Sequence, residues 1–262
     1  MYPLTRRLCM PDTIPGLSRF AFWQCVLFWC FPPKTNTANL LLRVGIKYST
    51  IYCDIVELCL KMGDSVRLQI TLVRNGMTAS AQRGEYLGYS IDESLLETER
   101  SRIRERYKAN LYPPVEIVFT SPLLRCRETV SRIYTQVPVL VRRDLAPMDL
   151  GRYEGLNFHQ IVSDKQFAQW ATAPDLGPLG DGEAPYAFQA RCTRGFQLIV
   201  DELANKGIAQ AAVVAHRGVL ESILQRFATP RSYYRNWALE YGGGYRLEYD
   251  TLLKCGFVRE KI

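Results

Sequence analysis

The chain has 262 residues and a formal net charge of +7, with 47% hydrophobic and 23% charged residues. This length fits one α/β domain with an appendage, and the composition excludes a disordered, collagen-like or multi-span membrane protein. Because Lys and Arg are scattered without a dense basic run, nucleic acid is not an expected partner. The eight cysteines contain no Cys-x-x-Cys pair for zinc or redox chemistry, which fits a reducing cytoplasm.

The first 61 residues differ in composition from the rest of the chain. They hold five of the eight cysteines and two of the four tryptophans. The apolar run Phe20–Phe31 ends at two prolines and is shorter than the roughly 20 residues that a membrane-spanning helix needs. A basic pair before this run also resembles the start of a secretory signal, but no small-residue cleavage site follows cleanly. We expect residues 1–61 to be an extension without its own core, residues 62–262 to be the folded domain, and no membrane association.

From residue 62 onward the pattern predicts strands and helices in alternation. Short runs rich in β-branched and apolar residues are typical of buried parallel strands, and they occupy Arg67–Arg74, Val115–Thr120 and Ala211–His216. Helical stretches lie between and after these strands, at Leu95–Leu111, Pro122–Tyr134, Phe188–Lys206 and Val219–Phe227. This alternation predicts an α/β fold, a three-layer α/β/α sandwich with a mostly parallel central sheet.

Polar residues follow two of the predicted strands. Arg74 and Asn75 lie at the end of the first strand, and His216, one of only two histidines, ends the last one. Ligands of such sheets bind outside the carboxyl ends of the strands. These residues are therefore candidates for a site, although each alone is as consistent with a structural role.

A further candidate lies at the start of a predicted helix. Ser121 or Thr120 can cap this helix, and Pro122 suits its first turn. Arg125 then lies in the first turn, where its guanidinium would project toward free backbone amides and the positive end of the helix dipole. Such a place favours an anion, above all phosphate.

In this order and at these boundaries, the residues resemble the histidine phosphatase superfamily, which has a phosphoglycerate mutase-like fold. The family's Leu-Val-Arg-His-Gly-x-Thr motif is matched by Leu72–Thr78, except that Asn75 stands at the position of the nucleophilic histidine. Ser121–Thr129 is similar to Ser-Pro-Leu-x-Arg-Ala-x-x-Thr, and His216 matches a Ser-His-Gly-Gly strand end in which Arg217 replaces the first glycine. Further matches are Gly88, Asp92, Leu95, Asp149, Gly151, Tyr153, Glu154, Gly155, Leu156, Gly182, Glu183, Arg191 and Gly218.

The resemblance implies hydrolysis of phosphomonoesters without a metal or other cofactor. In the family, the first histidine attacks phosphorus, two arginines and the second histidine neutralise the phosphoryl oxygens, and a glutamate protonates the leaving oxygen. Carried over to this sequence, Arg74, Arg125 and His216 are the phosphate-binding residues, and a small phosphorylated molecule is the expected partner. The short connections are closest in style to compact phosphatases such as the α-ribazole phosphatases.

Two catalytic positions depart from the family. The amide of Asn75 can hydrogen-bond a phosphate but has no free nitrogen lone pair with which to attack it. Pro147 stands at the position of the acid and has no proton to donate, so Asp149 or Glu154 would have to replace it. Two hypotheses stay open: an impaired phosphatase that acts on a small metabolite such as α-ribazole phosphate, and a non-catalytic pseudophosphatase that binds a phosphorylated ligand or a partner protein.

Overall fold

The computed structural model describes residues 65–172, 177–231 and 237–262. The expectation for residues 1–61 falls outside these ranges and stays a prediction. From Val66 onward the chain forms one unit around a seven-stranded sheet of order β3-β2-β4-β1-β6-β7-β5. The strands are β1 Arg67–Arg74, β2 Ile117–Thr120, β3 Val139–Val141, β4 Gln210–Ala215, β5 Ala228–Thr229, β6 Gly244–Asp250 and β7 Cys255–Lys261.

The sheet is mixed and mostly parallel, as predicted. Strands β3, β2, β4 and β1 pair in parallel, and so do β5 and β7. Only β6 runs antiparallel to its neighbours, β1 and β7. The three predicted strands are β1, β2 and β4, and they differ from the prediction only at their ends.

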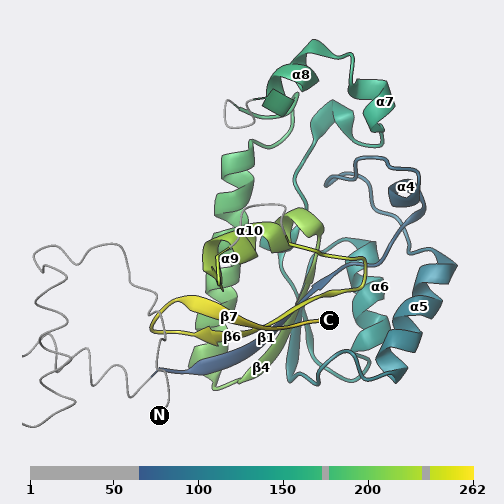
Figure 1. The fold of residues 1–262 in the computed structure, drawn as a ribbon. Coiled ribbons are helices and arrows are strands. Elements are labelled where there is room, and N and C mark those ends of the chain that lie inside the picture. Colours follow the sequence, from purple (N-terminus) through teal and green to yellow (C-terminus); the bar gives the residue numbers. More distant parts are fainter. Residues whose placement is uncertain (1–64, 173–176, 232–236) are drawn as a thin grey trace, which may run out of the picture. The chain divides into compact units, whose positions relative to one another are not determined.

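Helices cover both faces of the sheet, with α5 and α6 on one side and α9 and α10 on the other (Figure 1). The four predicted helices correspond to these four. The helices are α4 Ala79–Gln82, α5 Glu97–Lys108, α6 Leu124–Ile133, α7 Phe158–Ile161, α8 Lys165–Thr172, α9 Pro185–Lys206 and α10 Arg217–Phe227, with short 3-10 turns η1 Arg143–Leu145 and η2 Gly151–Tyr153. In the described ranges, none of these helices combines the length and the apolar character needed to cross a membrane.

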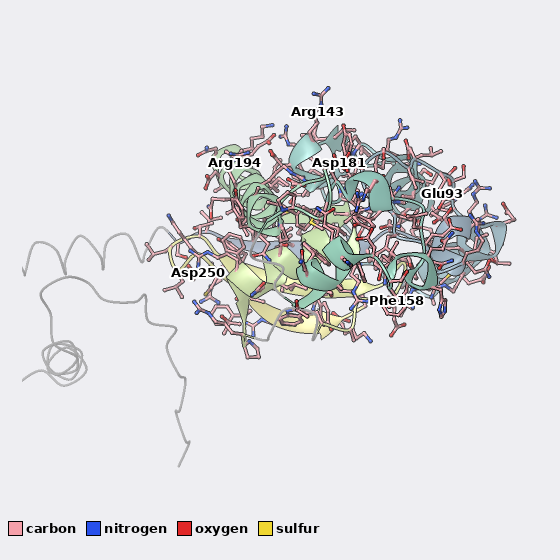
Figure 2. All side chains as sticks on the ribbon, turned by 90° about the horizontal axis from the view of Figure 1, so that it is seen from above. Glu93, Arg143, Phe158, Asp181, Arg194 and Asp250 are labelled. Atoms are coloured by element: carbon pink, nitrogen blue, oxygen red, sulfur yellow. The ribbon has the colours of Figure 1, made fainter. Side chains whose placement is uncertain are left out.

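Two hydrophobic cores confirm the three-layer arrangement. Successive side chains of a strand point to opposite faces of its sheet. Accordingly, Leu72 of β1 packs in the core that contains α9 and α10, whereas its neighbour Val73 packs in the core that contains α5 and α6. A third, smaller core lies around α7 and α8, a region called the cap below, and consists of Leu150, Tyr153, Ile161, Phe167 and Leu179. Figure 2, the view from above, looks down on the cap with Phe158 of α7 labelled.

The start of α6 differs from the prediction. The helix begins at Leu124, its N-cap residue is Leu123, and no side chain caps it. Pro122 therefore precedes the helix, and neither Thr120 nor Ser121 caps it. The physical reason is that Leu123 is extended, which leaves Ser121 two residues before the N-cap. Its hydroxyl accepts from the Leu123 N–H at 3.4 Å and lies 2.8 Å from Nε2 of His216.

The remaining helix boundaries follow local chemistry. Helix α9 begins at Pro185, earlier than predicted, because proline fits the first turn of a helix, where its missing N–H has no partner to lose. It ends at Gly207, whose φ of +66° is the left-handed conformation that glycine adopts without strain. This ending turns the chain back into β4.

Candidate functional site

The candidate site lies where three neighbouring parallel strands end. The last residue of β1, Arg74, pairs with Ala215 at the end of β4. The Asn75 N–H donates to the Ala215 carbonyl at 2.9 Å, so Asn75 and His216 leave the sheet next to each other. Strand β2 ends on the other side of β4, and Ser121 follows it. The sheet thus brings residues that follow three separate strands together at one edge.

His216 is buried and its imidazole is held from both sides. Arg125 Nε donates to His216 Nδ1 at 3.3 Å. A guanidinium N–H can only donate, so Nδ1 accepts, and the neutral ring carries its proton on Nε2, which donates to Ser121 Oγ at 2.8 Å. Burial, together with the positive charges of Arg125, Arg74 and Arg191, holds the pKa of His216 well below its ordinary value. The imidazole is therefore neutral near pH 7.

Arg125 lies in the first turn of α6, as predicted, and its side chain is buried. Its Nη1 donates to the Ile91 carbonyl at 2.6 Å, and its Nη2 donates to the Gly88 carbonyl at 3.1 Å. Burial lowers the pKa of Arg125, but a guanidinium stays charged at any physiological pH. Among the described residues no carboxylate forms an ion pair with it, and its hydrogen-bond partners are two backbone carbonyls and His216 Nδ1.

Arg74 supplies a second guanidinium at the same edge. Its Nη1 donates to the Leu239 carbonyl at 2.7 Å, and its guanidinium carbon lies 3.5 Å from the centre of the Tyr241 ring. Burial lowers its pKa, and the charge of Arg217 acts in the same direction. The Glu221 carboxylate opposes this by raising the pKa. Arg74 and Arg125 therefore flank His216 as two positive groups with hydrogen-bond donors.

Asn75 occupies the end of β1 with its side chain buried. Its Nδ2 donates to the Gly76 carbonyl at 2.8 Å. The Gly76 N–H in turn donates to Thr129 Oγ1 at 2.9 Å, and Thr129 donates to the Arg125 carbonyl at 2.7 Å. The bonds through Thr129 connect the end of β1 to helix α6. The bond to the Gly76 carbonyl holds the Asn75 amide in place.

No other described side chain at this edge has the chemistry of a nucleophile. Ser121 receives the His216 Nε2–H, so the imidazole has no free lone pair with which to take the serine proton. Cys126 Sγ lies 3.5 Å from His216 Nε2, but burial raises the pKa of this thiol to about 12. The thiolate, which is the reactive form, is therefore absent near pH 7.

The predicted acids lie on the loop between η1 and α7. Pro147 is buried, and its carbonyl accepts from Arg191 Nη2 at 3.3 Å. Asp149 is exposed, and its Oδ1 accepts from the Gly151 N–H at 2.8 Å. One oxygen of Asp149 is thus engaged in a local turn, and the other is open to solvent or a ligand.

Glu154 is held differently. Its Oε1 accepts from the backbone of Tyr89 at 2.8 Å and of Leu150 at 3.2 Å. Its Oε2 accepts from the Ser90 N–H at 2.9 Å and also from the Ser90 hydroxyl. A Cβ on Gly88 would lie 1.9 Å from Oε1, so glycine is required for this approach. Glu154 thereby ties the cap to the loop whose carbonyls hold Arg125.

Arg191 has a role that the sequence did not assign to it. Its Nη1 donates to the carbonyls of Asp144 in η1 at 3.1 Å and of Ala146 just after it at 3.0 Å, and its Nη2 donates to the Pro147 carbonyl. It also forms a two-pronged ion pair with Glu183, at 3.0 and 2.7 Å. In the sequence, the spacing between Glu183 and Arg191 matched the family motif. It did not indicate that Arg191 binds the backbone carbonyls near η1. The other histidine, His159, lies exposed on α7.

The arrangement is suited to holding an anion. Three guanidinium groups act electrostatically on His216. Charge-assisted hydrogen bonds from arginine to phosphate are strong and often two-pronged. In the part of the chain that the structure describes, no cluster of His, Cys, Asp and Glu could hold a metal ion. The site therefore presents cationic hydrogen-bond donors around a neutral imidazole, and an amide stands at position 75.

Comparison with known proteins agrees with this geometry. Residues 70–252 match the histidine phosphatase superfamily (branch 1). Among solved structures, the chain is similar to the α-ribazole phosphatase from Shigella flexneri, with a TM-score of 0.65 and 18% identity over 74% of this chain and 96% of that one. It is also similar to the phosphoglycerate mutase from Bacillus anthracis, with a TM-score of 0.65 and 16% identity over 76% and 94%. No curated protein matches the chain.

Proposed function

The chain belongs to the histidine phosphatase superfamily, branch 1, and from this premise we propose that it binds a phosphorylated small molecule where β1 and β4 end, without the covalent chemistry of the family. The observation that carries the proposal is the surroundings of His216. Arg74, Arg125 and Arg191 all act on this imidazole, whereas an amide, Asn75, stands in the nucleophile's position. The site keeps the groups that hold phosphate and lacks the one that attacks it.

Charge supports the binding half of the proposal. A buried charge is costly unless it is paired and hydrogen-bonded. Arg125 is buried with neutral hydrogen-bond partners only, two backbone carbonyls and the His216 imidazole. Arg74 is half-buried on a tyrosine ring. A phosphoryl group would give both guanidiniums a negative partner, so phosphate binding would also stabilise the fold.

Local chemistry supports the non-catalytic half. An amide nitrogen has its lone pair delocalised into the carbonyl, so Asn75 cannot form a phosphoenzyme. The neutral imidazole of His216 has its Nδ1 lone pair occupied by Arg125. Loss of a nucleophile from a cooperating site commonly lowers turnover by about a million-fold.

A second candidate function is slow hydrolysis of a small phosphomonoester, such as α-ribazole phosphate, by direct attack of water. The exposed carboxyl of Asp149 favours it, because this group lies two residues after Pro147 and one of its oxygens is open. Glu154 is a weaker candidate for the acid, since both of its oxygens accept hydrogen bonds from the protein.

The binding half is tested by melting the full chain with inorganic phosphate or vanadate. We expect the melting temperature to rise with ligand concentration, because a ligand selective for the native state stabilises it. Arg125→Ala should lose most of the rise, whereas Arg127→Ala, an exposed arginine of the same helix, should keep it. A melting temperature that phosphate leaves unchanged in the unmutated chain contradicts the proposal.

The two candidates are separated by an aryl phosphate assay. A binding protein should release no more phenol than its Arg125→Ala variant does. A slow hydrolase should release more. Asp149→Asn should then lower the rate on an alkyl phosphate, whose leaving oxygen needs a proton, because a general acid contributes about 10²-fold to 10⁴-fold.

A further inference from the structure

Arg217 is a cationic group that the proposed phosphate site does not use. It is the first residue of α10 and directly follows His216, at a position where the resembled motif has glycine. Its side chain is 49% exposed, and its Nε donates to Glu221 Oε1 at 2.8 Å. Among the described residues it has no other hydrogen-bond partner, so both terminal nitrogens are available to a ligand.

The sheet places Arg217 beside Arg74. Arg74 pairs with Ala215, two residues before Arg217, across the parallel β1–β4 ladder. The Glu221 carboxyl lies one helical turn further along α10 and is buried. Both Arg217 and Glu221 affect the pKa of Arg74, which agrees with this proximity. Arg217 is thus the more exposed of two guanidiniums at the same strand ends.

We propose that Arg217 binds a second anionic group of the ligand whose phosphoryl group is held by Arg74, Arg125 and His216. The ligand class is a small phosphomonoester that also carries a second phosphate or a carboxylate a few bonds away. This inference rests on the proposed function. It follows from position: Arg125 and His216 are buried and Arg74 is half-buried, whereas the more exposed Arg217 has two free donors at the same strand ends.

A purely structural role for Arg217 is the competing explanation. In that case Arg217 exists only to neutralise the buried Glu221 carboxylate, which needs a cationic partner. The two explanations differ in what they predict for ligands. Neutralisation of Glu221 gives no preference for a second anionic group, whereas direct binding does.

The experiment measures dissociation constants of the full chain for inorganic phosphate, pyrophosphate and phosphonoacetate at one pH and one ionic strength. Pyrophosphate adds a second phosphate, and phosphonoacetate adds a carboxylate. We expect at least one of the two to bind about 10-fold to 100-fold more tightly than phosphate, as one charge-assisted contact allows. Arg217→Gln should remove this advantage and change phosphate binding by less than about 3-fold.

Two further variants keep the test decisive. Arg217→Gln leaves the buried Glu221 carboxylate without its partner. The double variant Arg217→Gln with Glu221→Gln removes this unpaired carboxylate, and it should lose the preference for the two-anion probes in the same way. Arg226→Gln removes an exposed arginine from the last turn of the same helix and is the matched control for loss of one positive charge. This control should keep the preference for the two-anion probes.

The outcomes separate the inference from the proposed function. If phosphate binds but neither two-anion probe binds more tightly, the inference is wrong and the phosphate site stands. Equal losses in the Arg217 and Arg226 variants also overturn it, because the preference would then reflect overall charge. If none of the three probes binds the unmutated chain, the proposed function fails, and this inference fails with it.

Discussion

At the scale of single residues, Asn75 carries the proposed separation of binding from catalysis. Its amide lies at the end of β1, buried and bonded to the Gly76 carbonyl. The arginines that we propose to hold phosphate have other partners, because Arg125 is positioned by carbonyls and Arg74 by Leu239 and Tyr241. Under the proposal, an amide at position 75 therefore removes the nucleophile and leaves these arginines in place.

The first prediction is that Asn75→His restores a nucleophile. Arg74 and Arg125 would orient the phosphoryl group, so the variant should form an acid-labile phosphohistidine and hydrolyse aryl phosphates, whose phenolate leaves without an acid. Adding Pro147→Glu should raise the rate on alkyl phosphates by about 10²-fold to 10⁴-fold. Mass spectrometry of the phosphoenzyme and steady-state rates measure both steps. If Asn75→His yields no phosphoenzyme while phosphate still binds, the geometry is not catalytic.

The second prediction concerns Glu154. Its carboxylate accepts hydrogen bonds from Tyr89, Ser90 and Leu150, so Glu154→Ala should lower the free energy of unfolding by about 2–4 kcal/mol. Glu154→Gln keeps one acceptor oxygen and should lose less. Denaturant unfolding gives the values, and Glu97→Ala, an exposed carboxylate at the start of α5, is the control. Surface substitutions usually change the free energy of unfolding by no more than about 0.5 kcal/mol. A loss no larger than that would show that Glu154 does not tie the cap to the loop around Tyr89 and Ser90.

The sequence predicted where site residues lie along their strands and helices better than it predicted which side chains they contact. Arg125 was correctly placed in the first turn of α6, because the spacing of the Ser-Pro-Leu-x-Arg run fixes it. Ser121 was wrongly assigned to capping, because a serine before a helix is a common cap, and its bond to His216 joins two strand ends far apart in the chain. Local patterns cannot predict a contact of that kind.

At the scale of elements, Arg191 links helix α9 to the loop that carries Pro147. Its guanidinium bonds to the carbonyls of Asp144, Ala146 and Pro147 and to Glu183. The third prediction is that Arg191→Met lowers the free energy of unfolding by about 3–5 kcal/mol, since Glu183 and several carbonyls lose their partner. Pairing it with Glu183→Gln should recover part of the loss. Independent, additive effects of the two changes would show that the pair is not coupled.

The elements that the sequence did not predict are those with weak local patterns. Strands β1, β2 and β4 are buried on both faces, so their continuous apolar runs stand out. Strand β6 mixes charged with apolar residues, so its composition is not typical of a buried strand. It begins at Gly244, where an added Cβ would lie 1.8 Å from the Leu72 carbonyl oxygen. Its place beside β1 is set by antiparallel pairing rather than by composition. The cap, with its short helices α7 and α8, has too few residues per helix for a clear period.

At the scale of the whole molecule, the fold couples its stability to the site. The sandwich was predictable because strands and helices alternate, and parallel strands must end at one edge. Placing one buried and two half-buried guanidiniums near a buried imidazole has a cost, since each charge disfavours protonation of His216. Stability of the molecule must therefore depend on the protonation of one residue in the site.

The fourth prediction follows from this coupling. Burial and the charges of Arg125, Arg74 and Arg191 lower the pKa of His216 in the folded state well below the value of about 6.5 that it has when unfolded. Below pH 6.5 the unfolded chain therefore binds a proton that the folded chain does not, so the stabilisation present above that pH is lost as the pH falls. The slope should approach about 1.4 kcal/mol per pH unit.

His159 provides the control, because it is the only other histidine and is exposed on α7. Denaturant unfolding between pH 7.5 and 5 should show the slope in the unmutated chain and in His159→Gln, and a flatter dependence in His216→Gln, whatever the absolute stability of that variant. Carboxylates whose pKa is lowered by hydrogen bonds and ion pairs, such as Asp164 and Glu202, lose their contribution at lower pH, as the pH falls from their ordinary pKa through the lowered one. A slope that survives in His216→Gln would mean that other groups control stability in this window, and that His216 is not the buried neutral imidazole on which the proposed phosphate site depends.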